Sequence, residues 1–493
     1  MKKVSIAVFL IILIAFVYFR VIPILNQTVP YTYDQGRDFL KATEIIRDKH
    51  LPFIGPTTGI QGVFHGAWWY YFVLIPYLLF SGWPQGFYFG LFFFNLLANL
   101  WFFWFLKKNF SLAAAFFFLG IVSVSTFFIK TAFYASNNTL APLFILTFIY
   151  SLYHLFDKKK WQYLFLAGLS LGFVFETEMA FGLFIIPAFL IVFLLFKDLR
   201  HLLKSLKNIC AFFAGMLIPI GPRLLFELKN NFLQTRSFLA HLSSPENIHP
   251  LLFRAVAEER FRSFWQYWSG LFYRENLILA LLFLLALSGL ILLKNKAAFP
   301  KKNTSLFVLI LTLIIFVFSL LYKNSFFWSY YLDGIQYLFL FLMTAGFYLI
   351  EKNKKISLFA YLLLTVVIGT NIFALIKDVS GKKNVSLVGL RADNKIVSYF
   401  VENTKHQYFC LKIYTPPVIP YTYMYLLSYY ADRQKILYPK GDFYNNQCYY
   451  LIDKDEYQFR VDKWRDENIP KNSKLNKTVK FENGSRIELW VKN

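Results

Sequence analysis

Residues 31–71 read YTYDQGRDFLKATEIIRDKHLPFIGPTTGIQGVFHGAWWYY and form a polar island between two apolar segments, Val4–Phe19 and Ala67–Phe80. The island holds two aspartates four positions apart, Asp34 and Asp38, with a Gly-Arg pair between them and a histidine before an aromatic cluster. The flanking apolar segments would hold this island at a membrane surface. Carboxylates fixed there beside an arginine and a histidine favour acid–base chemistry on a lipid-borne substrate.

The composition excludes an ordinary soluble protein. Of the 493 residues, 57% are hydrophobic and only 16% are charged, whereas soluble domains carry about 25% charged residues. The charged residues come in short bursts between long apolar runs, as expected when loops stay in water and spans do not. The sequence therefore predicts an α-helical polytopic membrane protein with 11–13 transmembrane helices, a large first extracytoplasmic loop and a small C-terminal α/β extracytoplasmic domain.

The apolar runs set the predicted number of spans. They cover residues 4–19, 68–80, 87–106, 111–129, 139–156, 161–175, 181–196, 208–221, 277–293, 304–321, 335–350 and 356–376. Several are shorter than the ~20 residues that cross a bilayer unaided, so the apolar pattern does not define sharp boundaries for the spans. We expect an odd total, which places the two ends of the chain on opposite sides of the membrane.

The formal net charge of +24 is concentrated in short loops between the apolar runs. This distribution argues against nucleic-acid binding and indicates contact with the lipid bilayer, because excess Lys and Arg mark cytoplasmic loops. The basic loops are Lys107-Lys108, Lys158–Lys160, Lys197–Lys207, Lys294–Lys302 and Lys352–Lys355. With these loops inside, the chain is predicted to be a multi-pass plasma-membrane protein with a cytoplasmic N-terminus. Met1-Lys2-Lys3 precedes an apolar run without a small-residue cleavage site, which favours an uncleaved first span over a signal peptide.

The first part of the chain does not fit this topology without an exception. Lys2-Lys3 and Lys107-Lys108 are both expected in the cytoplasm, yet three apolar runs lie between them. One of the segments 68–80 and 87–106 would then be re-entrant or lie on the surface, or Lys107-Lys108 breaks the rule. We favour a partial segment at 68–80, which is short and begins with an interfacial aromatic cluster.

The tail changes character, because long apolar runs stop at residue 377. We therefore divide the chain into a transmembrane domain, 1–376, in which 20–66 form the catalytic first outer loop, and an extracytoplasmic α/β domain, 377–493. Short alternating segments separated by Pro, Gly and Asn predict strands. The predicted elements are strands at Tyr408–Ile413, Tyr449–Ile452 and Arg486–Val491 and a helix at Asp393–Asn403. In this tail, Cys410 and Cys448 form a disulfide if it faces an oxidising compartment, and two unpaired core cysteines are equally open.

The predicted topology gathers a set of polar residues on one face of the membrane. The candidates are Asp34 and Asp38 as catalytic residues, with Arg37, His65, Glu176, Glu178, Arg223, Glu227, Tyr330 and Tyr331 as substrate-binding residues. An arginine beside the membrane is also what a phosphate leaving group needs. The convergence of these residues is the main functional signal in the sequence.

Structural alternatives stay open for several candidates. Asp34 could cap a helix over Phe39–Arg47, and Asp38 could be a first-turn charge of the same helix. Arg223 and Glu227, four positions apart on a helix, could simply pair with each other.

Signatures of nucleotide or zinc chemistry are missing from the sequence. It contains no Gly-rich phosphate loop, CxxC, HExxH or GxSxG motif. His65 is one of seven histidines, and no two cluster in the predicted outer loops, so it could also be a simple interfacial residue. We expect no cofactor and no metal site, and a divalent metal lacks support.

Several motifs, taken in order, resemble a known family. Tyr-Asp-Gln-Gly-Arg-Asp (33–38), Leu-Pro…Gly-Pro-Thr (51–57) and Phe-His-Gly…Trp-Tyr-Tyr (64–71) carry most of the likeness. Weaker echoes follow at 136–144, 222–232, 330–331 and 425–430. The chain resembles the C-type (GT-C) membrane glycosyltransferases over about residues 1–435. Among them it is most similar to bacterial relatives of the protein O-mannosyltransferases and the lipid A aminoarabinose transferases.

The resemblance implies transfer of a sugar from a polyprenyl-phosphate donor to a glycan, lipid or protein acceptor at the outer membrane face. Asp34 matches the family's first-loop aspartate, which acts as general base or orients the acceptor hydroxyl. Gln35 follows where most members have an acid, which puts metal use in doubt and leaves Asp38 as a substitute one turn on. His65 keeps the family's histidine but lacks the proline that follows it. Arg223 would neutralise the leaving lipid phosphate.

A flippase or transporter of a lipid-linked glycan is the alternative function. It would need a similar basic groove but no catalytic base. Transporter folds often show internal repeats and broken helices deep in the membrane, and the sequence shows no such repeat. The transferase is therefore the favoured interpretation.

Overall fold

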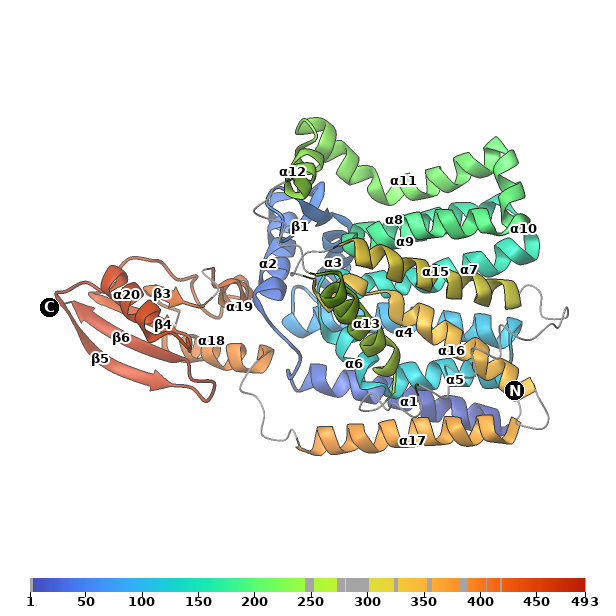
Figure 1. Cartoon of the computed structure of the whole chain (residues 1–493). Coiled ribbons are helices and arrows are strands. Elements are labelled where there is room, and N and C mark those ends of the chain that lie inside the picture. The colour runs from blue at the N-terminus through green and yellow to red at the C-terminus, as the bar shows by residue number, and fades with distance from the viewer. Residues whose placement is uncertain are drawn as a thin grey trace.

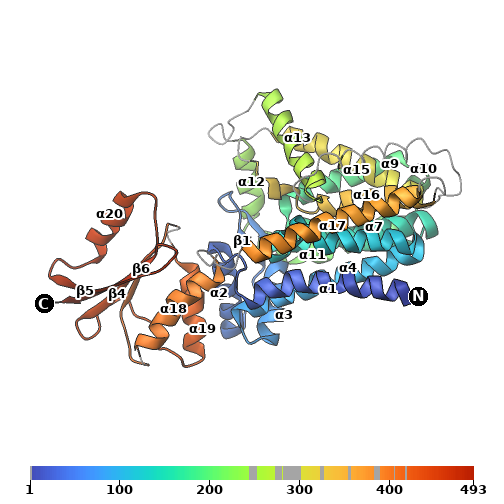
Figure 2. The same cartoon turned by 90° about the horizontal axis from the view of Figure 1, so that it is seen from below.

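The structure, a computed structural model, describes residues 3–243, 252–272, 280, 301–322, 327–352, 357–381, 389–404, 406–416 and 419–492. A bundle of helices carries at one end a small domain with a four-stranded sheet (Figure 1). The N-terminus lies at the opposite end of the bundle from this domain. The turned view in Figure 2 shows the same separation of the two parts.

The bundle is built from long apolar helices, which correspond to apolar runs of the sequence. They are α1 (Lys3–Leu25), α4 (Pro84–Asn109), α5 (Leu112–Val124), α7 (Ala141–Lys158), α8 (Trp161–Thr177), α9 (Met179–Leu195), α11 (Leu206–Lys229), α15 (Lys301–Leu321), α16 (Ile335–Lys352) and α17 (Ser357–Gly381). Shorter elements are α2 (Tyr33–Asp48), β1 (Ile54–Thr57), β2 (Phe64–Gly66), α3 (Trp68–Leu79), α6 (Thr126–Phe133), η1 (Asn137–Leu140), α10 (Lys197–Arg200), η2 (His201–Lys204), α12 (Leu233–Ser243), α13 (Phe253–Ser269) and η6 (Ser329–Leu332). Phe, Leu and Ile side chains fill the bundle core.

The first two long helices run antiparallel. Phe9, near the start of α1, contacts Phe103, near the end of α4, with ring centroids 5.2 Å apart. Further along, Phe16 contacts Phe92 with centroids 6.2 Å apart. Because α4 returns toward the start of α1, Lys107-Lys108 at its end lie on the same side of the bundle as the N-terminus.

The short length of helix α3 explains how the N-terminus and Lys107-Lys108 can lie on the same side of the bundle. Its 12 residues extend only about 18 Å at 1.5 Å per residue, against a hydrocarbon core of about 30 Å. The polar island and α3 therefore belong to one end of the bundle. This geometry agrees with the partial segment that the sequence predicts at 68–80.

The membrane character of the chain is confirmed, and its span count is partly described. Among the described residues, 6 helices are long and apolar enough to cross a membrane, or up to 8 if each bent pair counts as one span. Helices α8 and α3, with 17 and 12 residues, are shorter than the ~20 residues that cross a bilayer unaided. The predicted run at 277–293 lies outside the described residues except for Ala280, so the total of 11–13 stays a prediction.

Helices α5 and α6 meet at a break, with an angle of 60° between them. The break leaves the last carbonyl groups of α5 without helical partners. Arg20 of α1 is fully buried and donates to the carbonyl oxygens of Val122 at 2.7 Å and Ser123 at 3.3 Å. The Arg20 guanidinium thus lies at the negative end of the α5 dipole. This contact offsets the cost of burying the charge and stabilises the bend.

The C-terminal domain is an α/β unit, as predicted, with sheet order β3-β4-β6-β5. Its elements are α18 (Leu390–Thr404), β3 (Leu411–Tyr414), α19 (Tyr421–Asp432), β4 (Gln447–Ile452), α20 (Gln458–Asn468), β5 (Ser473–Lys480) and β6 (Arg486–Lys492). Strands β3 and β4 are parallel, and the other pairs are antiparallel. Cys410 and Cys448 form a disulfide between the starts of β3 and β4, which decides between the two alternatives left open by the sequence.

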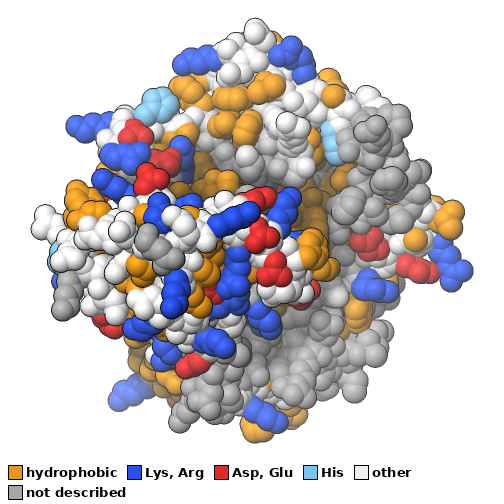
Figure 3. All heavy atoms as spheres, turned by 90° about the vertical axis from the view of Figure 1, so that its left-hand side faces the viewer, with side chains coloured by type: hydrophobic (Ala, Val, Ile, Leu, Met, Phe, Trp, Pro, Cys, Tyr) orange, Lys and Arg blue, Asp and Glu red, His pale blue; other side chains and the backbone are white. Residues whose placement is uncertain are grey.

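This domain is joined to the polar island through α19, which packs on α2 (Figures 1 and 2). Gly36 of α2 makes the approach possible, because a Cβ there would lie 2.5 Å from the backbone nitrogen of Thr422. Tyr31 also donates to the carbonyl oxygen of Thr422 at 3.0 Å. Figure 3 shows the molecule from this end, with many Lys and Arg side chains on the domain facing the viewer.

Candidate functional site

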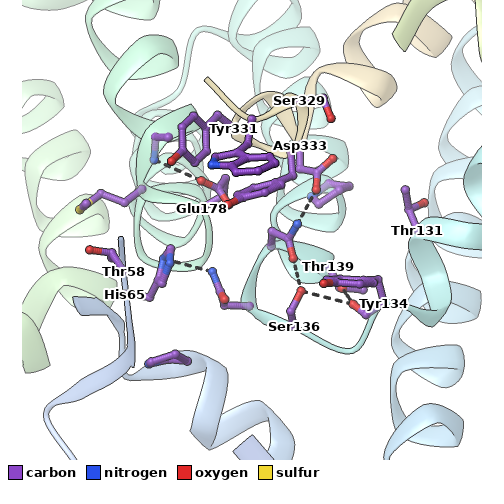
Figure 4. Close-up of a pocket in the computed structure, with 18 of the residues that line it drawn as sticks. Thr58, His65, Thr131, Tyr134, Ser136, Thr139, Glu178, Ser329, Tyr331 and Asp333 are labelled. Carbon is purple, nitrogen blue, oxygen red and sulfur yellow. Dashed lines mark hydrogen bonds between the residues drawn. The ribbon is translucent and has the colours of Figure 1, made fainter. Parts of the chain in front are cut away.

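A cavity of about 1000 Å³ lies where the polar island meets the ends of the bundle helices. Its walls come from the first turn of α2, the β1–β2 segment, α6, η1, the turn between α8 and α9, and the residues from η6 into α16. Its volume is that of a small-molecule site. The first loop, the Glu178 turn and the Tyr330-Tyr331 pair thus meet at one cavity, as the sequence topology led us to expect (Figure 4).

Asp34 and Arg37 form one side of the cavity, here called the loop wall. The Asp34 side chain is 44% exposed, and its carboxylate pairs with Arg37 at 3.0 Å, one helical turn on. The helix N-terminus at this turn also favours a negative charge. A partly exposed carboxylate held by a cation at a cavity surface is suited to accept a proton from a bound hydroxyl.

Asp38 lies behind this wall and does not line the cavity. It is fully buried, with Oδ1 accepting from Arg37 at 2.8 Å and Oδ2 accepting from the Trp69 indole at 2.7 Å. Burial raises the pKa of Asp38 to about 6, although Arg37 and Trp69 oppose the shift. The geometry therefore indicates that Asp38 anchors Arg37, and the direct catalytic role that the sequence predicts for Asp38 does not fit its position.

The hydrogen bonds of Gln35 account for an amide at a position where most members of the family that the sequence resembles have an acid. Its Oε1 accepts from the backbone nitrogen of Thr32 at 2.8 Å, which caps α2. Its Nε2 donates to the carbonyl oxygen of Ala135 at 3.2 Å, at the foot of η1. A carboxylate could make the first contact but not the second, because it has no proton to donate.

His65 lines the cavity from β2 and is held by Asn137 of η1. The Asn137 amide nitrogen lies 2.6 Å from the carbonyl oxygen of Thr177 and 3.1 Å from His65 Nδ1 (Figure 4). One amide proton goes to each acceptor, so Nδ1 is unprotonated and Nε2 carries the hydrogen. Burial, together with Arg223 and Arg37, lowers the pKa of His65 to about 3. His65 is thus a neutral hydrogen-bond donor.

Glu178 and Asp333 form the opposite wall of the cavity (Figure 4). Glu178 is buried and caps α9 by accepting from the backbone nitrogen of Ala180 at 3.3 Å. Asp333 is buried and contacts Asn138 Nδ2 at 2.5 Å and the Tyr267 hydroxyl at 2.6 Å. Burial raises the pKa of Asp333 to about 7, and burial with the nearby Asp333 raises the pKa of Glu178 well above its usual value.

Lys130 supplies a second positive charge to the cavity from α6. No carboxylate of the described residues pairs with it, whereas Arg37 is committed to Asp34 and Asp38. Tyr330 and Tyr331 add aromatic surface, with ring centroids 5.0 Å apart. The cavity therefore combines three carboxyl groups, two cations and aromatic rings.

The other predicted residues lie behind the cavity and do not line it. Arg223 pairs with Glu176 at 2.6 Å, and both are buried. Arg223 also donates to the carbonyl oxygen of Phe64 at 3.0 Å and to Gln234 at 2.9 Å. Glu227 accepts from the backbone nitrogen of Gln234 at 2.9 Å and so helps to begin α12. Arg223 and Glu227 do not pair with each other, and Arg223 holds the strand that carries His65.

Four functional candidates were not named as site residues from the sequence. Lys130 directly follows the apolar run 111–129, Asn137 and Asn138 lie within the motif at 136–144, and Asp333 just precedes the apolar run 335–350. A polar residue at the end of a span is the signal that could have selected them. Among the described residues, no group of three or more His, Cys, Asp or Glu is arranged to hold a metal ion.

Comparison with known proteins places the chain in a wider context. Residues 66–226 match the family model described as dolichyl-phosphate-mannose-protein mannosyltransferase. No curated protein matches the sequence significantly. The structure of ArnT from Cupriavidus metallidurans bound to undecaprenyl phosphate aligns with a TM-score of 0.65 at 10% identity, over 98% of this chain and 97% of that one. The apo state of the same protein aligns with a TM-score of 0.63 at 11% identity and the same coverage.

These matches confirm the fold that the resemblance predicts. The fold likeness extends over nearly the whole chain, including the C-terminal domain, while the sequence match covers the part from β2 to α11. The chain has the GT-C fold of the membrane glycosyltransferases, and its residues 66–226 match the dolichyl-phosphate-mannose-protein mannosyltransferase family.

Proposed function

We propose that this protein is a glycosyltransferase that moves a sugar from a polyprenyl-phosphate donor to a hydroxyl of a glycan, lipid or protein acceptor at the outer membrane face. The observation that carries the proposal is the position of Asp34, a partly exposed carboxylate in a cavity that also presents Arg37 and Lys130. The matched family and the undecaprenyl phosphate bound to ArnT support a lipid-phosphate donor.

In the proposed reaction Asp34 acts as general base. The acceptor oxygen attacks the anomeric carbon of the donor sugar while its proton passes to Asp34. The bond between the anomeric carbon and the phosphate oxygen breaks, and the electron pair leaves with the polyprenyl phosphate. A single displacement of this kind inverts the configuration at the anomeric carbon.

The leaving phosphate gains negative charge as the bond breaks, and the cavity offers cations to meet it. Lys130 is available as a direct partner, since no described carboxylate neutralises it. Arg37 lies between Asp34 and Asp38, so it can orient the base and still contribute positive potential. Preorganised charges of this kind lower the barrier where charge develops.

The remaining polar residues would position the donor sugar. The His65 Nε2 hydrogen is a donor, and the carboxyls of Glu178 and Asp333 can exchange hydrogen bonds with sugar hydroxyls. Tyr330 and Tyr331 offer ring faces on the same side of the cavity. In their protonated forms these carboxyls can bind hydroxyls and cannot take the acceptor proton in place of Asp34.

Behind the cavity, two buried ion pairs hold these groups in place. Asp38 fixes Arg37, and thereby the orientation of Asp34. Glu176 fixes Arg223, which clamps the Phe64 carbonyl next to His65. We therefore assign Asp38, Glu176 and Arg223 as positioning residues.

The decisive experiment is a transfer assay with the purified protein in lipid nanodiscs. Undecaprenyl phosphates carrying different radiolabelled monosaccharides are offered with native membrane extract as acceptor, with and without EDTA. Labelled product that disappears in Asp34→Asn establishes the transferase and identifies the donor. Glu44→Gln is the matched control, because Glu44 is a half-exposed residue of the same helix that pairs with Lys41 and does not line the cavity.

The same assay separates the transferase from the alternative, a flippase for a lipid-linked glycan. If Asp34→Asn transfers sugar like the wild type, Asp34 is not the base. If no donor yields product from folded protein, transport of the labelled lipid between leaflets of proteoliposomes becomes the activity to measure.

A further inference from the structure

A second cleft, of about 400 Å³, lies between the C-terminal domain and the start of α2. We infer that this cleft binds a saccharide, and that it holds the glycan chain of the acceptor while its hydroxyl is glycosylated. The inference rests on the proposed transferase function and names its acceptor class. Four features of the structure lead to it.

The first feature is the position of the cleft in the C-terminal fold. Strands β3 and β4 are parallel, and the residues that follow them, Thr415-Pro416 and Asp453-Lys454, line the cleft. Ligands of α/β sheets bind in the crevice outside the carboxyl ends of parallel strands. The cleft therefore occupies the part of this small domain where a ligand site is expected.

The second feature is the chemistry of the walls. Asp453 accepts from the Tyr423 hydroxyl at 2.7 Å and from the Ser485 hydroxyl at 2.8 Å. Both hydrogen bonds end on Oδ1 of Asp453. No described residue donates a hydrogen bond to Oδ2, which leaves that oxygen for a ligand. Asp393, in the first turn of α18, adds a second carboxyl, and Asn483 adds an amide on the rim.

Burial and the neighbouring Asp453 raise the pKa of Asp393 to about 8. Near neutral pH the two carboxyls therefore carry at least one proton between them, so they can both donate and accept. Paired donors and acceptors suit hydroxyl groups, which also do both.

The third feature is an aromatic rim. Tyr33 and Tyr421 both line the cleft, and their rings meet edge to face with centroids 4.9 Å apart. The faces of aromatic rings pack against the apolar C–H surface of a sugar while polar groups bind its hydroxyls. Carboxyls, an amide and tyrosines in one cleft therefore suit a saccharide.

The fourth feature is the distance along the chain to the proposed base. Thr32 and Tyr33 line this cleft, and the next residue, Asp34, lines the main cavity. The first turn of α2 is thus the partition between the two spaces. A glycan held by Tyr33 and Tyr421 would present its end to Asp34 from one side, while the lipid-linked donor reaches Asp34 from the other.

The variants that test this inference leave the main cavity untouched. Tyr421→Ala removes one rim ring, and Asp453→Asn removes an acceptor oxygen while keeping the shape of the side chain. Tyr457→Ala is the matched control, because Tyr457 is a 51% exposed tyrosine of the same domain that lines neither space.

The first measurement is equilibrium binding of a fluorescent pool of oligosaccharides released from the cell envelope of the source organism, with full-length protein in nanodiscs. A pool of fluorescent Ser/Thr-rich peptides is measured alongside. We expect Tyr421→Ala and Asp453→Asn to weaken glycan binding at least tenfold and Tyr457→Ala to leave it unchanged. Equal glycan binding by all four proteins, or binding of the peptides alone, would overturn the inference.

The second measurement is transfer of radiolabelled sugar to the same glycan pool. In the cleft variants the KM for the glycan should rise about tenfold, with kcat and the KM for the donor within twofold of the wild type. An unchanged glycan KM in an active wild-type assay refutes the acceptor cleft but spares the transferase. Absence of transfer by the wild type refutes the transferase, and the binding measurement then still decides whether the cleft holds a glycan.

Discussion

The two walls of the main cavity carry the same chemical group in opposite electrostatic settings. On the loop wall, the Asp34 carboxylate pairs with Arg37 at 3.0 Å. On the opposite wall, the hydrogen bonds of Asp333 with described residues go to the neutral groups of Asn138 and Tyr267, and burial raises its pKa to about 7. Carboxyls in one site whose surroundings differ in this way can take different parts in a reaction. In the proposed reaction the loop wall would supply the base, and the opposite wall would supply neutral hydrogen bonds.

Hydrogen counting on the opposite wall supports its neutral state. The Tyr267 hydroxyl lies 2.9 Å from the carbonyl oxygen of Ser329 and 2.6 Å from Asp333 Oδ1. One hydroxyl hydrogen cannot serve both acceptors. If Asp333 is protonated, it donates to Tyr267, and Tyr267 donates to Ser329, so every polar atom has a partner.

The largest expected effect separates the walls directly. Asp34→Asn removes the base but keeps the shape of the side chain, so kcat should fall by about 10²–10⁴-fold, the usual contribution of general base catalysis. Binding of undecaprenyl phosphate should stay within about threefold, because Lys130 and Arg37 remain. Radiolabelled transfer and tryptophan quenching by the lipid check the two quantities. A loss of lipid binding as large as the loss of kcat would show that Asp34 mainly shapes the cavity.

A smaller effect tests the cation of the cavity. Lys130→Met keeps the apolar stem and removes the charge, which should weaken undecaprenyl phosphate binding about tenfold, in line with a charged hydrogen bond partly screened by water. The loss should shrink at high salt. Lys41→Met is the control, since Lys41 lies on α2, pairs with Glu44 and does not line the cavity. Equal lipid binding by Lys130→Met and the wild type at low salt would remove Lys130 from the site.

Much of the arrangement could be predicted from the sequence because it depends on hydrophobic patterning. Apolar runs marked the membrane helices, and alternation marked β3, β4 and β6. Strand β5 was missed, since Ser473–Lys480 is a largely exposed, Lys-rich edge of the sheet and has no apolar alternation to reveal it. A strand without a buried face leaves no apolar alternation in the sequence.

Depth and pairing, by contrast, could not be predicted. Asp34 and Asp38 are one turn apart, yet one is 44% exposed and the other is sealed by Trp69. The partner of Arg223 turned out to be Glu176, 47 positions away, and not Glu227 at four positions. These outcomes depend on tertiary contacts that leave no local periodicity. They decide which residues touch substrate and which hold others in place.

The pH dependence of stability offers a further test of the opposite wall. Because the folded pKa of Asp333 lies near 7 and its ordinary value is 3.8, folding binds a proton here between those pH values. The unfolding free energy from this group is fully present below about pH 4 and is lost as pH rises through about 7. Asp333→Asn should remove that loss, because an amide can donate to Tyr267 and accept from Asn138 at any pH.

Thermal unfolding of the nanodisc protein at pH 5 and pH 8 measures this difference. Between pH 5 and pH 8, the free energy of unfolding of the wild type should fall by about 1–3 kcal/mol more than that of Asp333→Asn. Glu178 and Tyr267 face Asp333 and are retained in both proteins, so their own titration largely cancels. Parallel losses in the two proteins would mean that Asp333 is already ionised in the fold, and the contrast between the walls would disappear.

The smallest expected effect is at Glu178, and it is the sharpest check on the comparison. Glutamine has the shape of a protonated glutamate, and its carbonyl oxygen can still accept from the backbone nitrogen of Ala180, as Glu178 does at 3.3 Å. If the pKa of Glu178 is raised well above its usual value by burial and Asp333, Glu178→Gln changes no charge near pH 7. We therefore expect kcat within about threefold of the wild type and an unchanged Tm, in contrast to the same type of exchange at Asp34. A hundredfold fall in kcat in a stably folded Glu178→Gln protein would show that this carboxyl works in its ionised form, so that both walls, and not the loop wall alone, carry the charge that the reaction needs.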